Sequence, residues 1–119
     1  MAKTLSVRFE TPFSDFVLQS MKYVFHPEAL EEYRAAAHGY EKRGKALALR
    51  FVSAVEEAIW KIAEAPERWR IVEEDVHRGL THVFPYGILY TIESDFVLIV
   101  AVMHLSREPG YWKHRLTEN

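Results

Sequence analysis

The sequence contains no cysteine, so disulfide frameworks, thiolate metal sites and cysteine nucleophiles are excluded. It also has no long hydrophobic run: the longest, Phe96–Met103, is far shorter than the about 20 residues that a membrane-spanning helix needs. A charge excess of one sign is missing as well, because 15 Lys and Arg residues and 17 Asp and Glu residues leave a net charge of −2. Such a balance does not indicate a nucleic-acid-binding protein. The absence of cysteine agrees with a reducing compartment, and we expect a cytoplasmic location.

The overall composition of the chain is typical of one globular domain. The 119 residues are 49% hydrophobic and 27% charged, which excludes a disordered tail, a collagen-like fibre and a coiled coil. A chain of this length can bury a core of its own but is too short for two domains.

Residues 1–20 differ from the rest of the chain. No apolar signal sequence follows Lys3, and a second methionine, Met21, directly precedes a clear strand pattern. We therefore predict an N-terminal extension over residues 1–20 and the domain proper over residues 21–119. The extension is expected either to add an edge strand, or to cover part of the groove that a partner protein would use or exchange with a second copy of the chain, since it carries several strongly apolar side chains. These are Leu5, Val7, Phe9, Phe13, Phe16, Val17 and Leu18.

Periodicity predicts a strand, two helices and then three strands. Pro27 opens the first helix, whose first turn carries Glu28, Glu31 and Glu32, and Gly44 is a plausible end to it. The expected segments are a strand over 22–26, helices over 27–43 and 45–64, and strands over 76–84, 87–93 and 96–104. This order predicts an α+β fold, in which an N-terminal strand and a helical hairpin pack on a twisted antiparallel sheet of three to four strands.

The strand over 96–104 is apolar on both faces. Simple alternation places Phe96, Leu98, Val100 and Val102 on one face, and Val97, Ile99, Ala101 and Met103 on the other. Both faces should therefore be covered. The helical hairpin covers one, and the aromatic residues of the C-terminal end, the extension or a partner protein covers the other.

Candidate chemistry is concentrated after residue 76. There is no glycine-rich phosphate loop, no G-x-S-x-G and no H-E-x-x-H motif. His77 and His82 lie five residues apart, an odd spacing that places them on opposite faces of a strand, so no metal site and no cofactor are expected.

The basic residues admit a catalytic and a structural interpretation. Arg78 and Arg107 could clamp a phosphate, with His104 or His114 as proton donor. Alternatively, Arg78 pairs with helix glutamates, Arg107 holds the chain end and His104 is an ordinary strand-end residue. The Tyr111–Trp112 pair is likewise either a contact surface for a partner or a cover for the open sheet face.

Three segments in order resemble a known family. They are Phe25–Ala29, the run Phe84–Tyr90 that follows Arg78, and His104–Arg115. Together they resemble the RelE/ParE superfamily of toxins from type II toxin-antitoxin modules, also called plasmid stabilisation proteins, and they are closer to its ParE-like branch.

This resemblance implies a toxin that a cognate antitoxin neutralises and that inhibits a protein target such as DNA gyrase without chemistry of its own. It further implies that the chain end binds the target. The target-binding candidates are Arg107, Tyr111, Trp112, Lys113, His114 and Arg115.

Two alternatives remain open at this point. A RelE-like toxin would be a ribosome-dependent mRNA endoribonuclease, with Arg78, Arg107 and His104 as its catalytic residues. A third interpretation is a non-toxic interaction domain on the same fold. The expected partners are an antitoxin and either gyrase or the ribosome, in a homodimer or a toxin–antitoxin hetero-oligomer, with no membrane involved.

Overall fold

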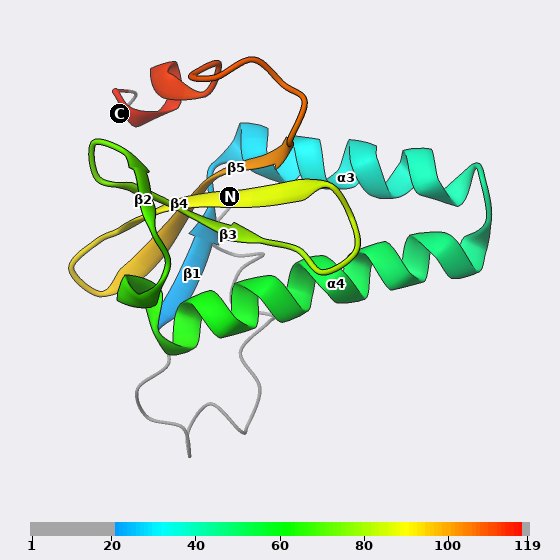
Figure 1. Ribbon diagram of the computed structural model, residues 1–119, viewed down its shortest axis with the longest axis horizontal. Helices are drawn as coiled ribbons and strands as arrows, with labels where there is room; N and C mark the ends of the chain where they lie inside the picture. The colour runs from blue at the N-terminus through cyan, green and yellow to red at the C-terminus, as the bar shows by residue number, and fades with distance from the viewer. Residues whose placement is uncertain (1–20, 118–119) are drawn as a thin grey trace.

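A computed structural model describes residues 21–117. The predicted extension over residues 1–20 lies outside the described residues. The elements follow one another as β1 (Lys22–Phe25), α3 (Pro27–Glu41), α4 (Lys45–Glu64), η1 (Pro66–Arg68), β2 (Ile71–Glu73), β3 (Val76–Leu80), β4 (Tyr86–Ile92), β5 (Phe96–His104) and η2 (Lys113–Leu116). The two long helices form a hairpin beside the sheet (Figure 1). Within the described range, no helix is both long and apolar enough to cross a membrane.

The five described strands form one mixed sheet in the order β1-β5-β4-β3-β2. The predicted α+β class is confirmed, but two details differ from the expectation. β1 pairs with β5 in parallel, with Tyr23 opposite Val97, and the short strand β2 adds a fifth member at the other edge. Both differences concern pairings between distant or very short segments, which hydrophobic periodicity does not report.

The helix ends follow local rules. Pro27 lies at the first position of α3, and the Nδ1 atom of His26 accepts a hydrogen bond from the Glu28 backbone N–H at 3.0 Å. A short turn then leads into α4, whose N-cap is Gly44 with φ of 150°, a backbone angle that glycine adopts without a Cβ penalty. α4 spans the predicted residues and stops before Pro66, because the residue before proline avoids helical angles.

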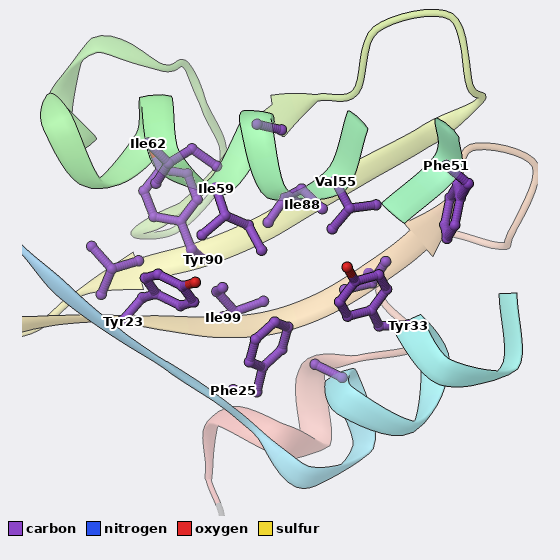
Figure 2. Packing of buried hydrophobic residues seen from close by; sticks show 14 residues of the cluster. Tyr23, Phe25, Tyr33, Phe51, Val55, Ile59, Ile62, Ile88, Tyr90 and Ile99 are labelled. Carbon is purple, nitrogen blue, oxygen red and sulfur yellow. The ribbon is translucent and has the colours of Figure 1, made fainter. Parts of the chain in front are cut away.

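One face of the sheet, called here the helix face, packs against α3 and α4. Its cluster is rich in aromatic rings: Phe51 of α4 lies 5.4 Å from the Phe84 ring and 5.1 Å from the Tyr86 ring, measured between centroids. Figure 2 shows side chains from both helices and from β1, β4 and β5 meeting in this cluster. The fully buried members include Phe25, Phe51, Val55, Ile59, Ile88, Tyr90 and Ile99.

The opposite face, called here the tail face, has a smaller cluster. It contains Val76, Leu89, Val100, Ala101, Met103 and Trp112. The simple alternation predicted for β5 is therefore wrong beyond Val100, because Ala101 and Met103 lie in the tail-face cluster and Val102 packs with the helix-face cluster. The register between β4 and β5 shifts at Leu89/Tyr90: Leu89 is paired with Ala101 and Tyr90 with Ile99, which leaves Val100 as an extra residue in β5. An extra residue of this kind, a β-bulge, reverses the faces of all the residues that follow it.

The strand predicted over 76–84 is also shorter than expected. β3 ends at Leu80, and the side chain of Thr81 donates a hydrogen bond to the Phe84 carbonyl at 2.8 Å. Val83 has a φ of 76°, an angle that a strand cannot contain and that a β-branched residue rarely adopts. The chain therefore turns over residues 81–85 before β4 begins.

Candidate functional site

The C-terminal tail, residues 105–117, covers the tail face of the sheet. Trp112 is only 3% exposed and packs with Leu89 and Met103, while Tyr111 and Leu116 pack against the same cluster. Of the two interpretations of the Tyr111–Trp112 pair, the structure therefore supports a sheet cover for Trp112.

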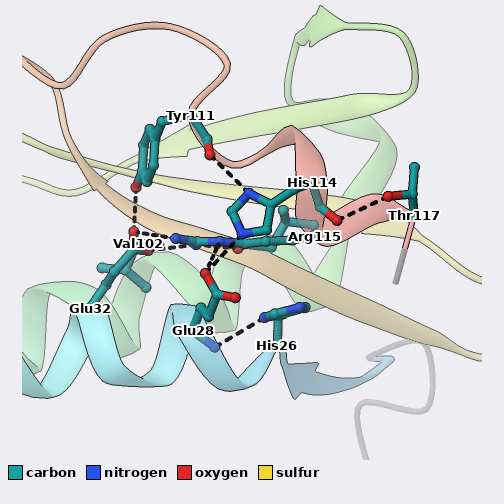
Figure 3. Close-up of polar contacts among 9 residues, drawn as sticks. His26, Glu28, Glu32, Val102, Tyr111, His114, Arg115 and Thr117 are labelled. Carbon is teal, nitrogen blue, oxygen red and sulfur yellow. Dashed lines mark hydrogen bonds and ion pairs between the residues drawn. The ribbon is translucent and has the colours of Figure 1, made fainter. Parts of the chain in front are cut away.

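Glu32 of α3 binds the tail from the side. Its Oε1 atom accepts hydrogen bonds from the Val102 N–H at 2.9 Å and from Nη1 of Arg115 at 3.0 Å. Its Oε2 atom accepts from the Tyr111 hydroxyl at 2.5 Å and from Nη2 of Arg115 at 2.9 Å. Nη1 of Arg115 also donates to the Val100 carbonyl at 2.9 Å. The carboxylate thus joins α3, β5 and the tail in a single network (Figure 3).

The electrostatics of this network match its geometry. Burial opposes the charge of Arg115, yet the Glu32 carboxylate raises the pKa of its guanidinium. Burial and the hydrogen bond to Glu32 together raise the pKa of the Tyr111 hydroxyl. Arg115 is therefore a buried cation that stays charged because its partner is charged and close.

Glu28, one turn earlier in α3, forms an exposed part of the same network. Its Oε1 atom lies 3.0 Å from Nε2 of His114 and 3.2 Å from Nε of Arg115. The hydrogen bond to His114 lowers the pKa of the Glu28 carboxyl, and Arg115 adds to the effect. Two acidic residues of α3 therefore hold two basic residues of the tail.

The remaining basic residues of the tail point outward. Nζ of Lys113 forms an ion pair with Glu73 of β2, which raises the pKa of the lysine. The guanidinium of Arg107 lies 3.7 Å from the centre of the Tyr111 ring, a cation–π contact. Arg107, Lys113 and His114 are exposed, whereas Trp112 and Arg115 are buried.

Arg78 and Arg107 are brought together although they lie 29 positions apart in the chain. Both line a cavity of about 210 Å³ between the tail, β2, β3, β4 and the end of β5. The stem of Arg78 lies over Gly87, where a Cβ atom would come within 3.2 Å of the Arg78 Cδ. Glycine at this position therefore makes room for the arginine stem.

His104, the third catalytic candidate, lies on the other side of the sheet. Its ring contacts the Tyr86 ring at 5.2 Å, and its Nδ1 atom lies 2.8 Å from the hydroxyl of Ser106. It lines a groove with Gly39 and Tyr40 of α3. The structure therefore unites the two arginines but separates them from His104.

The two histidines predicted to share one strand, His77 and His82, have separate structural environments. Nδ1 of His77 lies 2.7 Å from the Trp69 carbonyl, and its ring stacks on Tyr90 at 5.2 Å. His82 lies beyond the end of β3. Within residues 21–117, no group of three or more potential ligand side chains is arranged to hold a metal ion.

Sequence reasoning missed the roles of Glu28 and Glu32. Their position in a first helical turn suggested only an interaction with the helix dipole. The contact between Glu32 and Arg115 joins residues 83 positions apart, so no local pattern could indicate it. The charge of Arg115 in an otherwise apolar cover of the sheet was the one available signal, because a buried arginine requires a carboxylate partner.

The fold and the tail define a class of small α+β proteins in which a helical hairpin covers one sheet face and the chain end covers the other. The family described as ParE toxin of type II toxin-antitoxin system, parDE, matches residues 23–109. The chain belongs to this family, which confirms the resemblance to the RelE/ParE superfamily on its ParE-like side. The matched range includes Arg78, His104 and Arg107 and ends before Tyr111. No curated protein and no solved structure matches the chain.

Proposed function

We propose that this toxin acts by binding a protein target such as DNA gyrase, and that a cognate antitoxin neutralises it. The observation that carries the proposal is the position of His104 on the helix face, away from Arg78 and Arg107 on the tail face. General acid–base cleavage of RNA needs the proton-transfer group within hydrogen-bond reach of the phosphate that the arginines hold. A binding function has no such requirement.

The tail supplies the proposed contact surface. Trp112 and Arg115 are buried, so within the target-binding set they act as anchors. Arg107, Lys113 and His114 are exposed and would touch the target directly. Because the anchors fix the backbone between them, Lys113 and His114 are held in place before binding, and Arg107 rests on the Tyr111 ring. Both constraints lower the entropy cost of association.

The test is controlled expression of the full chain, with gyrase supercoiling and mRNA 5′ ends assayed in the same cells. We expect growth arrest, impaired supercoiling and intact mRNA. Arg107→Ala should relieve the arrest, whereas Arg50→Ala, which changes an exposed arginine on α4, should not. Intact supercoiling together with growth arrest would contradict the gyrase assignment.

The RelE-like endoribonuclease stays as the second candidate because Arg78 and Arg107 line one cavity. Two guanidinium groups in that position could bind a phosphate from two sides. Codon-phased cuts in translated mRNA, abolished by Arg78→Ala in a folded variant, would favour this function over the first.

A further inference from the structure

The cavity beside Arg78 and Arg107 has an apolar interior. Its walls include Val72, Leu89, Met103 and Leu105. Leu89 and Met103 belong to the buried tail-face cluster, whereas Leu105 is 44% and Val72 is 37% exposed. The cavity therefore leads from the solvent, past two partly exposed aliphatic side chains, to the buried cluster.

The charged groups around this opening are mostly positive. Within residues 21–117, no acidic side chain forms an ion pair with Arg78 or Arg107. The acidic residue that lines the cavity is Glu73, and Lys113 already neutralises it. Two arginines thus stand at an apolar opening with no acidic partner from the described part of the chain.

Both arginines are held by packed groups. The Arg107 guanidinium lies on the Tyr111 ring at 3.7 Å, and Glu32 fixes that tyrosine through its hydroxyl. The Arg78 stem lies in the space left by Gly87. Positioned donors of this kind lose little freedom when they bind a ligand.

We propose that this cavity binds an acidic–apolar peptide segment of a partner protein. One aliphatic side chain enters between Leu105 and Met103, and a neighbouring carboxylate on the peptide accepts hydrogen bonds from Arg78 and Arg107. The proposal rests on the proposed function in treating the tail side of the sheet as a protein-binding surface, but it does not require the target to be gyrase.

An RNA ligand fits these features less well. Its phosphates would satisfy the arginines but would leave the aliphatic walls without a partner, and exposed apolar surface at a cavity favours an apolar side chain. The chain carries a net charge of −2, which gives little general attraction for a polyanion. A peptide that combines an aliphatic side chain with a carboxylate satisfies both parts of the cavity.

The test is a chemical-shift titration of the ¹⁵N-labelled full chain with three end-blocked peptides. The probe has the sequence Ser-Asp-Leu-Glu-Ser; one control replaces its leucine by serine, and the other replaces both acids by lysine. We expect the probe to shift the backbone signals of Arg78, Met103, Leu105 and Arg107, and both controls to bind about tenfold or more weakly, the loss that corresponds to one apolar contact or one charge-assisted hydrogen bond.

Variants sharpen the assignment. Arg78→Ala and Arg107→Ala should each weaken binding of the probe about tenfold, and Arg50→Ala, on α4, should leave it unchanged. Denaturation curves would establish that each variant is folded. Equal binding of probe and controls, shifts confined to other surfaces, or stronger binding of a hexaadenylate RNA at these residues would overturn the proposal.

The peptide titration and the gyrase assay test the two proposals independently, so one proposal can be contradicted while the other is supported. Probe binding at the cavity, together with unimpaired supercoiling in cells, would support the peptide site and contradict gyrase as the target. Impaired supercoiling without probe binding at Arg78 and Arg107 would support the proposed function and overturn the peptide site.

Discussion

The two faces of the sheet are covered by different kinds of packing. On the helix face, two long helices bury aromatic and aliphatic side chains such as Phe51, Tyr33 and Ile59. On the tail face, a short segment with one turn of 3₁₀ helix buries Trp112 and depends on the charged contacts of Glu32 with Arg115. The first cover is apolar and extensive, whereas the second is small and partly ionic.

Because the two covers differ in this way, we expect the helix face to determine the stability of the domain and the tail to carry the proposed binding function. Burial of large apolar side chains supplies most of the folding free energy, so the helix face should determine whether the chain folds. The tail carries the exposed basic residues Arg107, Lys113 and His114, and its polar anchors fix their positions. Substitutions of Glu28 or Glu32, which bind the tail, should therefore loosen the tail more than they destabilise the whole domain. The following variants test this comparison in order of decreasing effect.

The largest effect is expected on the helix face. Phe51 is fully buried among four aromatic rings, and Phe51→Ala should lower the free energy of unfolding by about 3–5 kcal/mol. Leu49→Ala, on the same helix but 60% exposed, should change it by less than about 0.5 kcal/mol. Chemical denaturation followed by circular dichroism measures both. Equal losses would show that α4 does not bury one specific face.

Glu32→Ala tests the tail face. It removes the acceptor for Val102, Tyr111 and Arg115, although Arg115 keeps Glu28 and the Val100 carbonyl. We expect a loss of about 1–3 kcal/mol and faster amide exchange over residues 111–115 than in β4. The control is Glu31→Ala, whose side chain is 75% exposed and should cost less than about 0.5 kcal/mol. Uniform acceleration of exchange across the sheet would contradict a local role for Glu32.

Val83→Gly should have a smaller effect of opposite sign. Val83 is 81% exposed with a φ of 76°, so glycine relieves backbone strain and loses little burial. We expect a gain of about 0.5–1 kcal/mol in thermal or chemical denaturation. Leu80→Gly, at the end of β3, is also exposed but has no positive φ and should destabilise by a similar amount. A destabilised Val83→Gly variant would show that the valine side chain itself is needed.

The smallest effect should be the pH dependence that Glu28 contributes. Its folded-state pKa lies below the ordinary value of 4.5, so the unfolded chain takes up the proton first as the pH falls. The stabilisation is present above that ordinary value and is lost as the pH falls through the folded-state pKa. Because the pair is exposed, we expect only a modest decline. Denaturation midpoints at several pH values should fall less steeply for Glu28→Gln than for the unaltered chain, and parallel curves would exclude this contribution.

Local patterns in the sequence predicted most elements well. The helix Lys45–Glu64 and the strand Phe96–His104 have the expected bounds, because long periodic segments with Gly44 and Pro66 at the ends leave few alternatives. The errors lie where a tertiary contact decides. The bulge opposite Leu89 reversed the face of Val102, and the positive φ of Val83 shortened the preceding strand.

The candidate site was predictable only in part. Arg78 and Arg107 stood out as arginines in a neutral half of the chain, and the structure brings them to one cavity. His104 stood out equally, but the bulge in β5 and the register with Tyr86 place it on the helix face. Glu32 gave no signal of its own, since its partners lie at positions 102, 111 and 115.

The sequence by itself determined the two helices and most strands, the α+β class and the family, because periodicity, capping residues and short motifs are local properties of the chain. The tertiary structure alone decided which basic residues share a surface. That choice depends on strand register, on a single extra residue in β5 and on a carboxylate whose partners are distant in sequence, and none of these leaves a local pattern.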